Sequence, residues 1–223
     1  VTKVSNERGF KYEFFRGTNI VFRLSDKDVD VDFEGPLAPF VRNILMSNLM
    51  LHFKYYKYVK VLAEREGARV YTLYYPPFPS KPFVKMLKTV ARTMVTRRFV
   101  PRAVTIATTF ACQCKCLHCS AAGHFRKDIP ELSTEEAKSV IDQSLDTGVA
   151  VVTFTGGEPL LREDIFDLIS YVDPRKAVAV LFTNGLLLSE EVLDRLRDAG
   201  LYSLFVSLDS VVPEEHDRLR GHP

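Results

Sequence analysis

The stretch VAVVTFTGGEP, residues 149–159, runs from a continuously apolar segment directly into a turn, which is typical of the end of a buried strand. The same rhythm of apolar strand, loop and helix recurs on both sides of it. Strands that are apolar throughout, rather than alternating, favour a parallel sheet covered by helices. We therefore predict an α/β fold. Its strands are 104–109, 149–154, 177–182 and 201–206, and its helices are 133–146, 163–171 and 189–199.

The loop after each predicted strand carries an unusual sequence. The first strand leads to CQCKCLHC at residues 112–119, the second to GGEP at 156–159, the third to TNG at 183–185 and the fourth to SLD at 207–209. In parallel α/β folds, the carboxyl ends of the strands lie at one edge and build the active site there. We expect these four loops to form one site.

The cysteine loop predicts an iron–sulfur cluster. Cys112, Cys116 and Cys119 form C-x3-C-x2-C, which supplies three of the four thiolates that a four-iron cluster usually takes and leaves one iron open. All four cysteines of the chain lie in this loop, so metal binding is a better explanation than a disulfide framework. A zinc site made of Cys114, Cys116, Cys119 and His124 is the alternative, but zinc explains neither GGEP nor TNG. Cys114 is otherwise a bystander thiol.

The ordered set C-x3-C-x2-C, GGEP, TNG and SLD resembles the radical S-adenosylmethionine (radical SAM) superfamily, most closely members that mature peptides or build cofactors. The resemblance covers the second half of the chain. It implies a 4Fe–4S cluster on Cys112, Cys116 and Cys119, with S-adenosyl-L-methionine on the open iron. Reductive cleavage of that cofactor would give a 5′-deoxyadenosyl radical that abstracts hydrogen from an unidentified substrate, with ferredoxin or flavodoxin as electron donor.

The resemblance also implies roles for side chains in the four loops. His118 stands where the family usually has an aromatic residue near the adenine. Glu158 would meet the ammonium group of S-adenosyl-L-methionine, and Ser207 its ribose or carboxylate. Asp209 is equally well explained as a helix N-cap. The full set of implied cofactor-binding residues is His118, Gly156, Gly157, Glu158, Thr183, Asn184 and Ser207.

The family's fold is a partial parallel (β/α) barrel that normally has six strands. Four strands can be recognised here, so we expect a barrel truncated after the fourth strand, and hence a fragment of a longer enzyme whose catalytic competence alone is doubtful. The fourth strand would then be an unpaired edge.

The first hundred residues differ in composition, and we predict three regions: 1–36, 37–103 and 104–223. Strands at 10–15 and 19–24 form a hairpin in the first, with a third strand at 29–33 whose Asp28, Asp30 and Asp32 line a solvated face rather than a metal site. The second is a basic, aromatic, helical extension with helices over 37–62 and 81–99, and residues 37–110 hold 13 basic against 2 acidic residues. In the second helix Lys81, Lys85, Lys88 and Arg92 follow one face.

The basic segment supports an alternative function, a non-catalytic iron–sulfur or zinc module that docks on a membrane or nucleic acid. We favour instead a helix packed on the protein with a solvated basic face. The chain of 223 residues has a net charge of +2, no apolar run of about 18 residues and no signal segment. We expect a cytoplasmic protein, with membrane-peripheral contact as an option.

Overall fold

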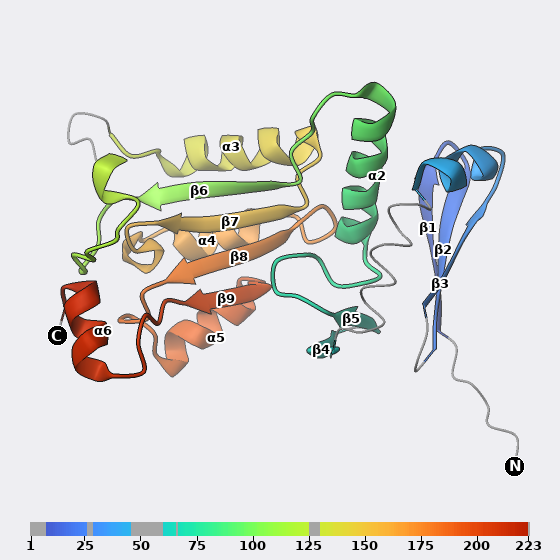
Figure 1. Cartoon of the computed structure of the whole chain (residues 1–223). Helices are drawn as coiled ribbons and strands as arrows, with labels where there is room; N and C mark the ends of the chain where they lie inside the picture. Colours follow the sequence, from blue (N-terminus) through green and yellow to red (C-terminus); the bar gives the residue numbers. More distant parts are fainter. Residues whose placement is uncertain (1–7, 26–28, 46–59, 66, 125–129, 223) are drawn as a thin grey trace, which may run out of the picture. The chain divides into compact units, whose positions relative to one another are not determined.

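The computed structural model describes residues 8–25, 29–45, 60–65, 67–124 and 130–222. The chain forms two compact units, Val1–Arg102 and Ala103–Pro223. The second unit holds the predicted α/β region, shown from yellow-green to red in Figure 1.

Four parallel strands form the sheet of the second unit, in the order β6-β7-β8-β9. Their bounds are β6 Ala103–Thr109, β7 Val151–Gly156, β8 Val178–Thr183 and β9 Ser203–Val206. Spatial order equals chain order, so each strand pairs with the next one along the sequence. The predicted parallel sheet is confirmed, and every strand begins or ends within two residues of its predicted bounds.

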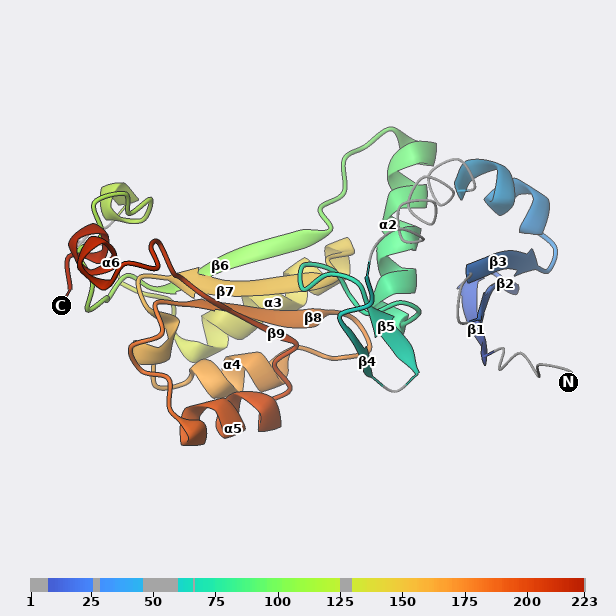
Figure 2. The same ribbon diagram turned by 60° about the horizontal axis from the view of Figure 1, so that its bottom comes forward.

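Three helices connect the strands: α3 Thr134–Thr147, α4 Ile165–Tyr171 and α5 Glu190–Asp198. They cover the same face of the sheet, as Figure 2 shows below the strands. The core between them contains side chains that are almost fully buried, among them Phe154, Ile141 and Leu168. Ser133 caps α3, and Glu136 completes the predicted capping box by accepting a hydrogen bond from the Ser133 backbone N–H.

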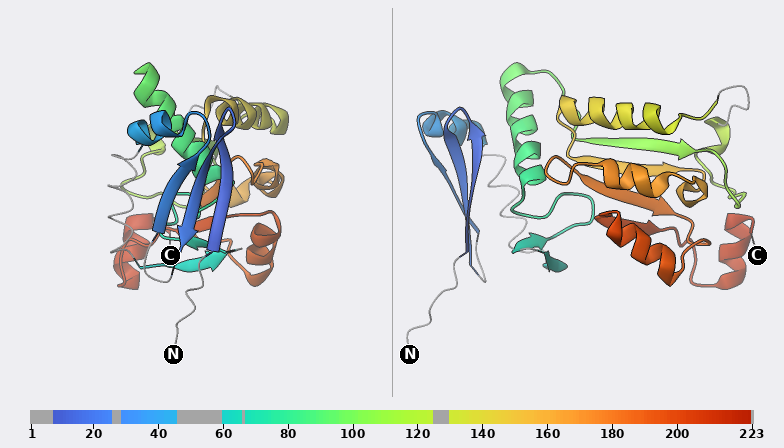
Figure 3. Two further views of the ribbon diagram at one scale, coloured as in Figure 1. Left: turned by 90° about the vertical axis from the view of Figure 1, so that its right-hand side faces the viewer. Right: turned by 180° about the vertical axis from the view of Figure 1, so that it is seen from behind.

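The opposite face of the sheet carries a smaller apolar cluster built on Val151, Val178 and Val180. Phe182 and Phe205 extend it with stacked rings whose centroids lie 4.7 Å apart. One helix-covered face and one apolar inner face are what the first four strands of a parallel barrel require, and the right-hand view of Figure 3 shows the sheet from behind. The predicted partial-barrel fold class is therefore confirmed.

After β9, the chain forms α6, Pro213–Arg220, which lies beside the cysteine loop in Figure 1. Its N-cap is Val212, with no capping side chain, so Asp209 does not cap this helix. A 3-10 turn, η1 Ala122–His124, follows the cysteine loop, and another, η2 Pro159–Leu161, begins at the proline of GGEP.

The first unit contains the predicted hairpin and third strand as an antiparallel sheet of β1 Arg8–Phe15, β2 Thr18–Leu24 and β3 Val29–Glu34. Asp30 pairs with Arg23 at 3.0 Å and Asp32 pairs with Arg42, so both carboxylates are used in ion pairs; Asp28 lies outside the described residues. Phe22 of β2 forms edge-to-face contacts with Phe78 at 4.9 Å, which anchors the core of this unit.

The helical prediction for the basic extension is only partly correct. Residues 38–45 are helical, and residues 46–59 of the predicted first helix lie outside the described part. Residues 60–62 are not helical, because they lead into a short hairpin of β4 Ala63–Arg65 and β5 Ala68–Val70 that closes around Gly67 at φ +81°. The second helix, α2 Lys81–Thr96, is confirmed, but it ends earlier than predicted at a left-handed Arg97.

Candidate active site at the carboxyl edge of the sheet

The four predicted loops leave the same edge of the sheet. Parallel pairing brings the end of β6 next to β7, β7 next to β8 and β8 next to β9. Ser207 donates its backbone N–H to the carbonyl oxygen of Thr183 at 3.0 Å, so the SLD loop remains paired with the TNG loop beyond the last ladder residues. The structure thus brings the four motifs together.

The two glycines of GGEP are required by close backbone packing. Gly157 donates to Thr109 O at 2.7 Å, and Glu158 donates to Ala111 O at 2.8 Å. A Cβ atom on Gly156 would lie 2.1 Å from Thr109 O, and one on Gly157 would lie 2.2 Å from Ala111 O. Any side chain here would push away the segment that leads into the cysteine loop. The backbone of Thr109 and Ala111 is by itself sufficient reason for both glycines. The predicted close approach of these glycines to a ligand therefore stays a prediction.

Glu158 links β7 to β8 from a fully buried position. Its carboxylate is 0% exposed. Oε1 accepts from Thr183 Oγ1 at 2.7 Å and from Leu160 N at 3.1 Å, and Oε2 accepts from Asn184 N at 2.7 Å. The carboxylate therefore fixes the TNG loop, and an ammonium ligand would have to share these oxygens.

Asn184 faces the cysteine loop. Its side-chain Nδ2 lies 3.1 Å from Gln113 Oε1 and 3.9 Å from Cys112 Sγ, within hydrogen-bonding range of sulfur. Cys112 and Cys119 are exposed, Cys116 is half-buried, and all are free thiols. Exposed thiols with an amide donor at one sulfur suit a loop that binds an external group.

Cys114 differs from its neighbours. Burial raises the pKa of the Cys114 thiol to about 11, and the neighbouring Cys112 and Cys116 contribute to the rise. The bystander role predicted for Cys114 from the sequence stays a prediction.

His118 and Ser207 occupy the outer part of the site. His118 Nε2 lies 3.5 Å from Asp209 Oδ2, and the imidazole is 53% exposed along its side chain. Ser207 is half-buried. Their predicted contacts with the adenosyl moiety and the carboxylate remain predictions.

Three charged side chains that were not predicted from the sequence also contact this edge. Glu131 Oε1 accepts from Thr109 Oγ1 at 2.7 Å and from Phe110 N at 2.8 Å, where β6 enters the cysteine loop. Arg162 donates to Thr108 O at 2.7 Å. Arg220 of α6 lies near the sulfur of Cys116. None belongs to a recognisable motif, although Arg162 follows GGEP by only three residues.

Within the described ranges, no three histidine, cysteine, aspartate or glutamate side chains are arranged to hold a single metal ion. The choice between cluster and zinc therefore depends on the donor set and on family membership. The donor set fits a cluster, because three thiols within eight residues leave the sheet edge together and two of their sulfurs face nitrogen donors.

Comparison with known proteins decides the family. The family model described as "Radical SAM superfamily" matches residues 106–223, which is more than half of the chain. The chain belongs to the radical SAM superfamily. Enzymes of this superfamily use a 4Fe–4S cluster and S-adenosyl-L-methionine, so the cofactors predicted from the cysteine loop are confirmed at family level.

Several curated radical SAM relatives match the same region. The AdoMet-dependent heme synthase of Methanosarcina barkeri is 38% identical over 130 residues, covering 58% of this chain and 37% of the relative. Fe-coproporphyrin III synthase of the same organism is 41% identical over 116 residues (51% and 28%). The mycofactocin maturase MftC of Mycobacterium tuberculosis is 34% identical over 122 residues (54% and 31%). The chain spans about a third of the length of these relatives.

A solved structure, that of Streptococcus suis SuiB bound to precursor peptide SuiA, resembles a larger part of the chain. The match has a TM-score of 0.50 at 18% identity and covers 91% of this chain and 50% of SuiB. At this identity it shows similarity of fold alone. Because the match covers 91% of this chain, it includes residues of the first unit as well as the second.

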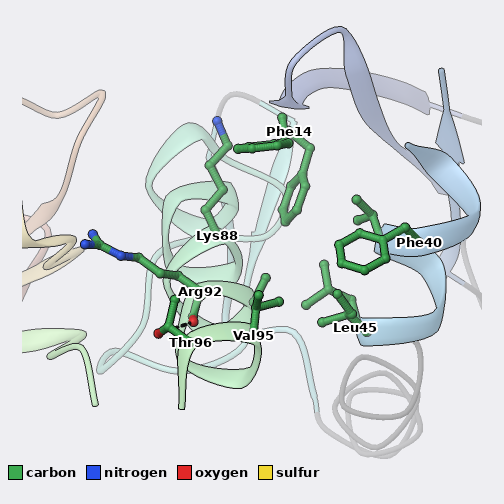
Figure 4. Close-up of a pocket in the computed structure, with 11 residues that line it drawn as sticks. Phe14, Phe40, Leu45, Lys88, Arg92, Val95 and Thr96 are labelled. Atoms are coloured by element: carbon green, nitrogen blue, oxygen red, sulfur yellow. Dashed lines mark hydrogen bonds between the residues drawn. The ribbon is translucent and has the colours of Figure 1, made fainter. Parts of the chain in front are cut away.

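The basic helix of the first unit lies beside an apolar cavity of about 470 Å³. Figure 4 shows Val95 of α2 facing Phe40 and Leu45 across it, while Arg92 extends away. Phe83 and Leu87 are buried, Lys85 is half-buried, and Lys81, Lys88 and Arg92 are exposed. Among the helices of the described residues, no one has both the length and the apolar character needed to span a bilayer.

Proposed function

We propose that this chain carries the cofactor-binding part of a radical SAM enzyme. Cys112, Cys116 and Cys119 would hold the 4Fe–4S cluster. The reduced cluster, with S-adenosyl-L-methionine bound, supplies a 5′-deoxyadenosyl radical that abstracts hydrogen from a substrate. The single observation that best supports this is the meeting of all four motifs at the carboxyl edge of one parallel sheet.

In this proposal, the protein fixes geometry at the edge of the sheet. Gly156 and Gly157 bring the GGEP loop against the base of the cysteine loop. The buried carboxylate of Glu158 accepts a hydrogen bond from the backbone N–H of Asn184. The side-chain amide of Asn184 is thereby held facing Cys112. Thr183 completes that junction through its hydroxyl, which donates to Glu158 Oε1.

His118 and Ser207 complete the proposed S-adenosyl-L-methionine site. The exposed imidazole of His118 offers a face for stacking or a nitrogen for a hydrogen bond to adenine. Ser207 follows β9, the last strand of the sheet, and would meet the ribose or carboxylate.

Peptide or cofactor maturation is the substrate class that we propose. The relatives named above include a maturase and two enzymes of porphyrin chemistry, and the structural neighbour is bound to a precursor peptide. An electron donor such as ferredoxin or flavodoxin would reduce the cluster. We propose a cytoplasmic location, because a loop of free thiols requires reducing surroundings.

Anaerobic reconstitution tests the proposal. After reduction with dithionite, the chain should bind about four irons and release 5′-deoxyadenosine from added S-adenosyl-L-methionine. Cys116→Ala should lose both properties, whereas Cys114→Ala is the matched control and should retain iron. If Cys116→Ala and the wild-type chain bind equal amounts of iron, the cluster assignment fails.

The alternative is a non-catalytic iron–sulfur or zinc module that docks through its basic segment. The specific support for that alternative comes from Lys88 and Arg92, whose exposed charges lie beside the apolar cavity. A basic and apolar surface of this kind would bind peripherally to an anionic membrane. Co-sedimentation with phosphatidylserine vesicles tests it. Lys88→Ala with Arg92→Ala should weaken binding, and unchanged sedimentation would return α2 to a packing role.

A further inference from the structure

Helix α6 is joined to the cysteine loop by its backbone. Lys115 donates its N–H to Arg220 O at 2.9 Å, and Leu117 donates to Leu219 O at 3.0 Å. These two bonds flank Cys116 on both sides. They hold the middle cysteine of the predicted cluster loop against the last turn of α6.

Gly221 makes this close approach possible. It ends α6 in the left-handed region at φ +60°, and a Cβ atom there would lie 2.6 Å from Lys115 O. The helix therefore ends at the loop in a conformation that glycine adopts without strain. As a result, the side chain of Arg220, the residue just before, lies close to the cysteines.

The guanidinium of Arg220 lies between a carboxylate and a sulfur. Nε is 2.8 Å from Asp209 Oδ2, a contact that is an ion pair rather than a well-directed hydrogen bond. Nη1 donates toward Cys116 Sγ at 3.6 Å. The side chain of Arg220 is only 13% exposed, and that of Asp209 is 24% exposed, so solvent screens this arrangement less than it would a surface pair.

We propose that Arg220 is a positioning residue for the cluster site, whose hydrogen bond to the sulfur of Cys116 favours the reduced form. The inference rests on the proposed function. Reduction by a one-electron donor adds one negative charge, part of which resides on the ligand sulfurs. A guanidinium stays protonated at any working pH and stabilises that charge. Hydrogen bonds to ligand sulfurs are among the factors that set cluster potentials.

Asp209 orients Arg220 and opposes part of its charge. It holds Nε, which leaves Nη1 directed at Cys116. It also approaches His118 Nε2 at 3.5 Å and donates its backbone N–H to His216 Nδ1 at 3.3 Å. The SLD motif is thereby connected to the cluster loop through Arg220, in addition to any contact that Ser207 makes.

The test is a redox titration of the anaerobically reconstituted chain, followed by electron paramagnetic resonance of the reduced cluster. Arg220→Met should keep its iron and lower the midpoint potential, with about a tenfold fall in the equilibrium constant for reduction, or about 59 mV for one electron. Asp209→Asn should raise the potential, because the guanidinium keeps its place and loses a compensating charge. Arg218→Met, an exposed arginine on the same turn of α6, is the matched control and should leave the potential unchanged.

The two variants should shift the midpoint potential in opposite directions. Structural damage to the site would instead shift the potential of both variants in the same direction. Unchanged potential in Arg220→Met at full iron content overturns the proposal. If Arg220→Met loses its iron, Asp209→Asn decides: a rise supports the role of Arg220, and an unchanged or lower potential overturns it. Absence of a cluster in the wild-type chain would instead refute the proposed function, and this inference with it.

Discussion

Replacing Glu158 by glutamine should destabilise the second unit even in the absence of any cofactor. The carboxylate is fully buried and accepts three hydrogen bonds through two oxygens. A glutamine amide has one oxygen and one NH2 group. If the glutamine oxygen accepts from Leu160 N, the NH2 group faces the N–H of Asn184. If the amide is reversed, the NH2 group faces the N–H of Leu160. In either orientation a partly buried backbone donor loses its acceptor.

The expected cost follows from that count. A hydrogen bond to a charged group contributes about 1.5–3 kcal/mol, and an unsatisfied buried donor costs a similar amount. We expect Glu158→Gln to lower the free energy of unfolding by about 2–3 kcal/mol. Urea denaturation of the apo chain, followed by far-ultraviolet circular dichroism, measures this loss.

Glu163→Gln is the control, because Glu163 is exposed on the same loop and undergoes the same chemical change. Its effect should stay within about 0.5 kcal/mol. If the two variants unfold at the same urea concentration, Glu158 has no structural role, and its predicted part in binding an ammonium group becomes the better explanation.

Three further predictions concern the packing around this edge. Gly157→Ala should destabilise the fold and reduce iron uptake in reconstitution, because its Cβ would lie 2.2 Å from Ala111 O; equal iron content would contradict this. Arg162 holds the pKa of Asp164 below its ordinary 3.8, so the carboxylate stabilises the fold above that pH, and this contribution is lost as pH falls through the lowered pKa. Asp164→Asn should therefore cost about 1–2 kcal/mol at pH 7 and progressively less below pH 3.8 in urea titrations. Ser133→Ala should cost about 1 kcal/mol by the same measurement through loss of the α3 cap, and an unchanged midpoint would argue against the capping box.

The sheet and its loops could be predicted because local sequence determines them. The apolar run before GGEP and the turn that follows it favour a buried strand, and the capping box at Ser133 marks where α3 begins. The hairpin of β4 and β5 was missed, because its strands are three residues long and contain charged side chains. Contacts with distant segments support it instead, such as the hydrogen bond from Arg69 Nη2 of β5 to Ser25 O at 2.9 Å.

The sequence indicates which residues lie in the site more readily than what each side chain contacts there. A motif tells which residues meet, but not the direction in which a side chain points. GGEP predicts a carboxylate at the ligand, and the structure adds that Glu158 accepts a hydrogen bond from Asn184 N; its contact with an ammonium group stays a prediction. The two glycines are likewise required by the backbone of Thr109 and Ala111.

Arg220 could not be found from the sequence, because its importance arises from contacts between distant segments. It lies 104 positions after Cys116, and only the return of α6 to the cysteine loop brings the two together. The loop that supplies the thiols is therefore positioned by elements that come later in the chain: the GGEP backbone below it, Asn184 at Cys112 and α6 at Cys116. They follow three different strands of the parallel sheet, β7, β8 and β9. Correct placement of the three thiols thus requires all four strands of the sheet, from β6 to β9. The short cysteine loop therefore depends on nearly the whole second unit for its position.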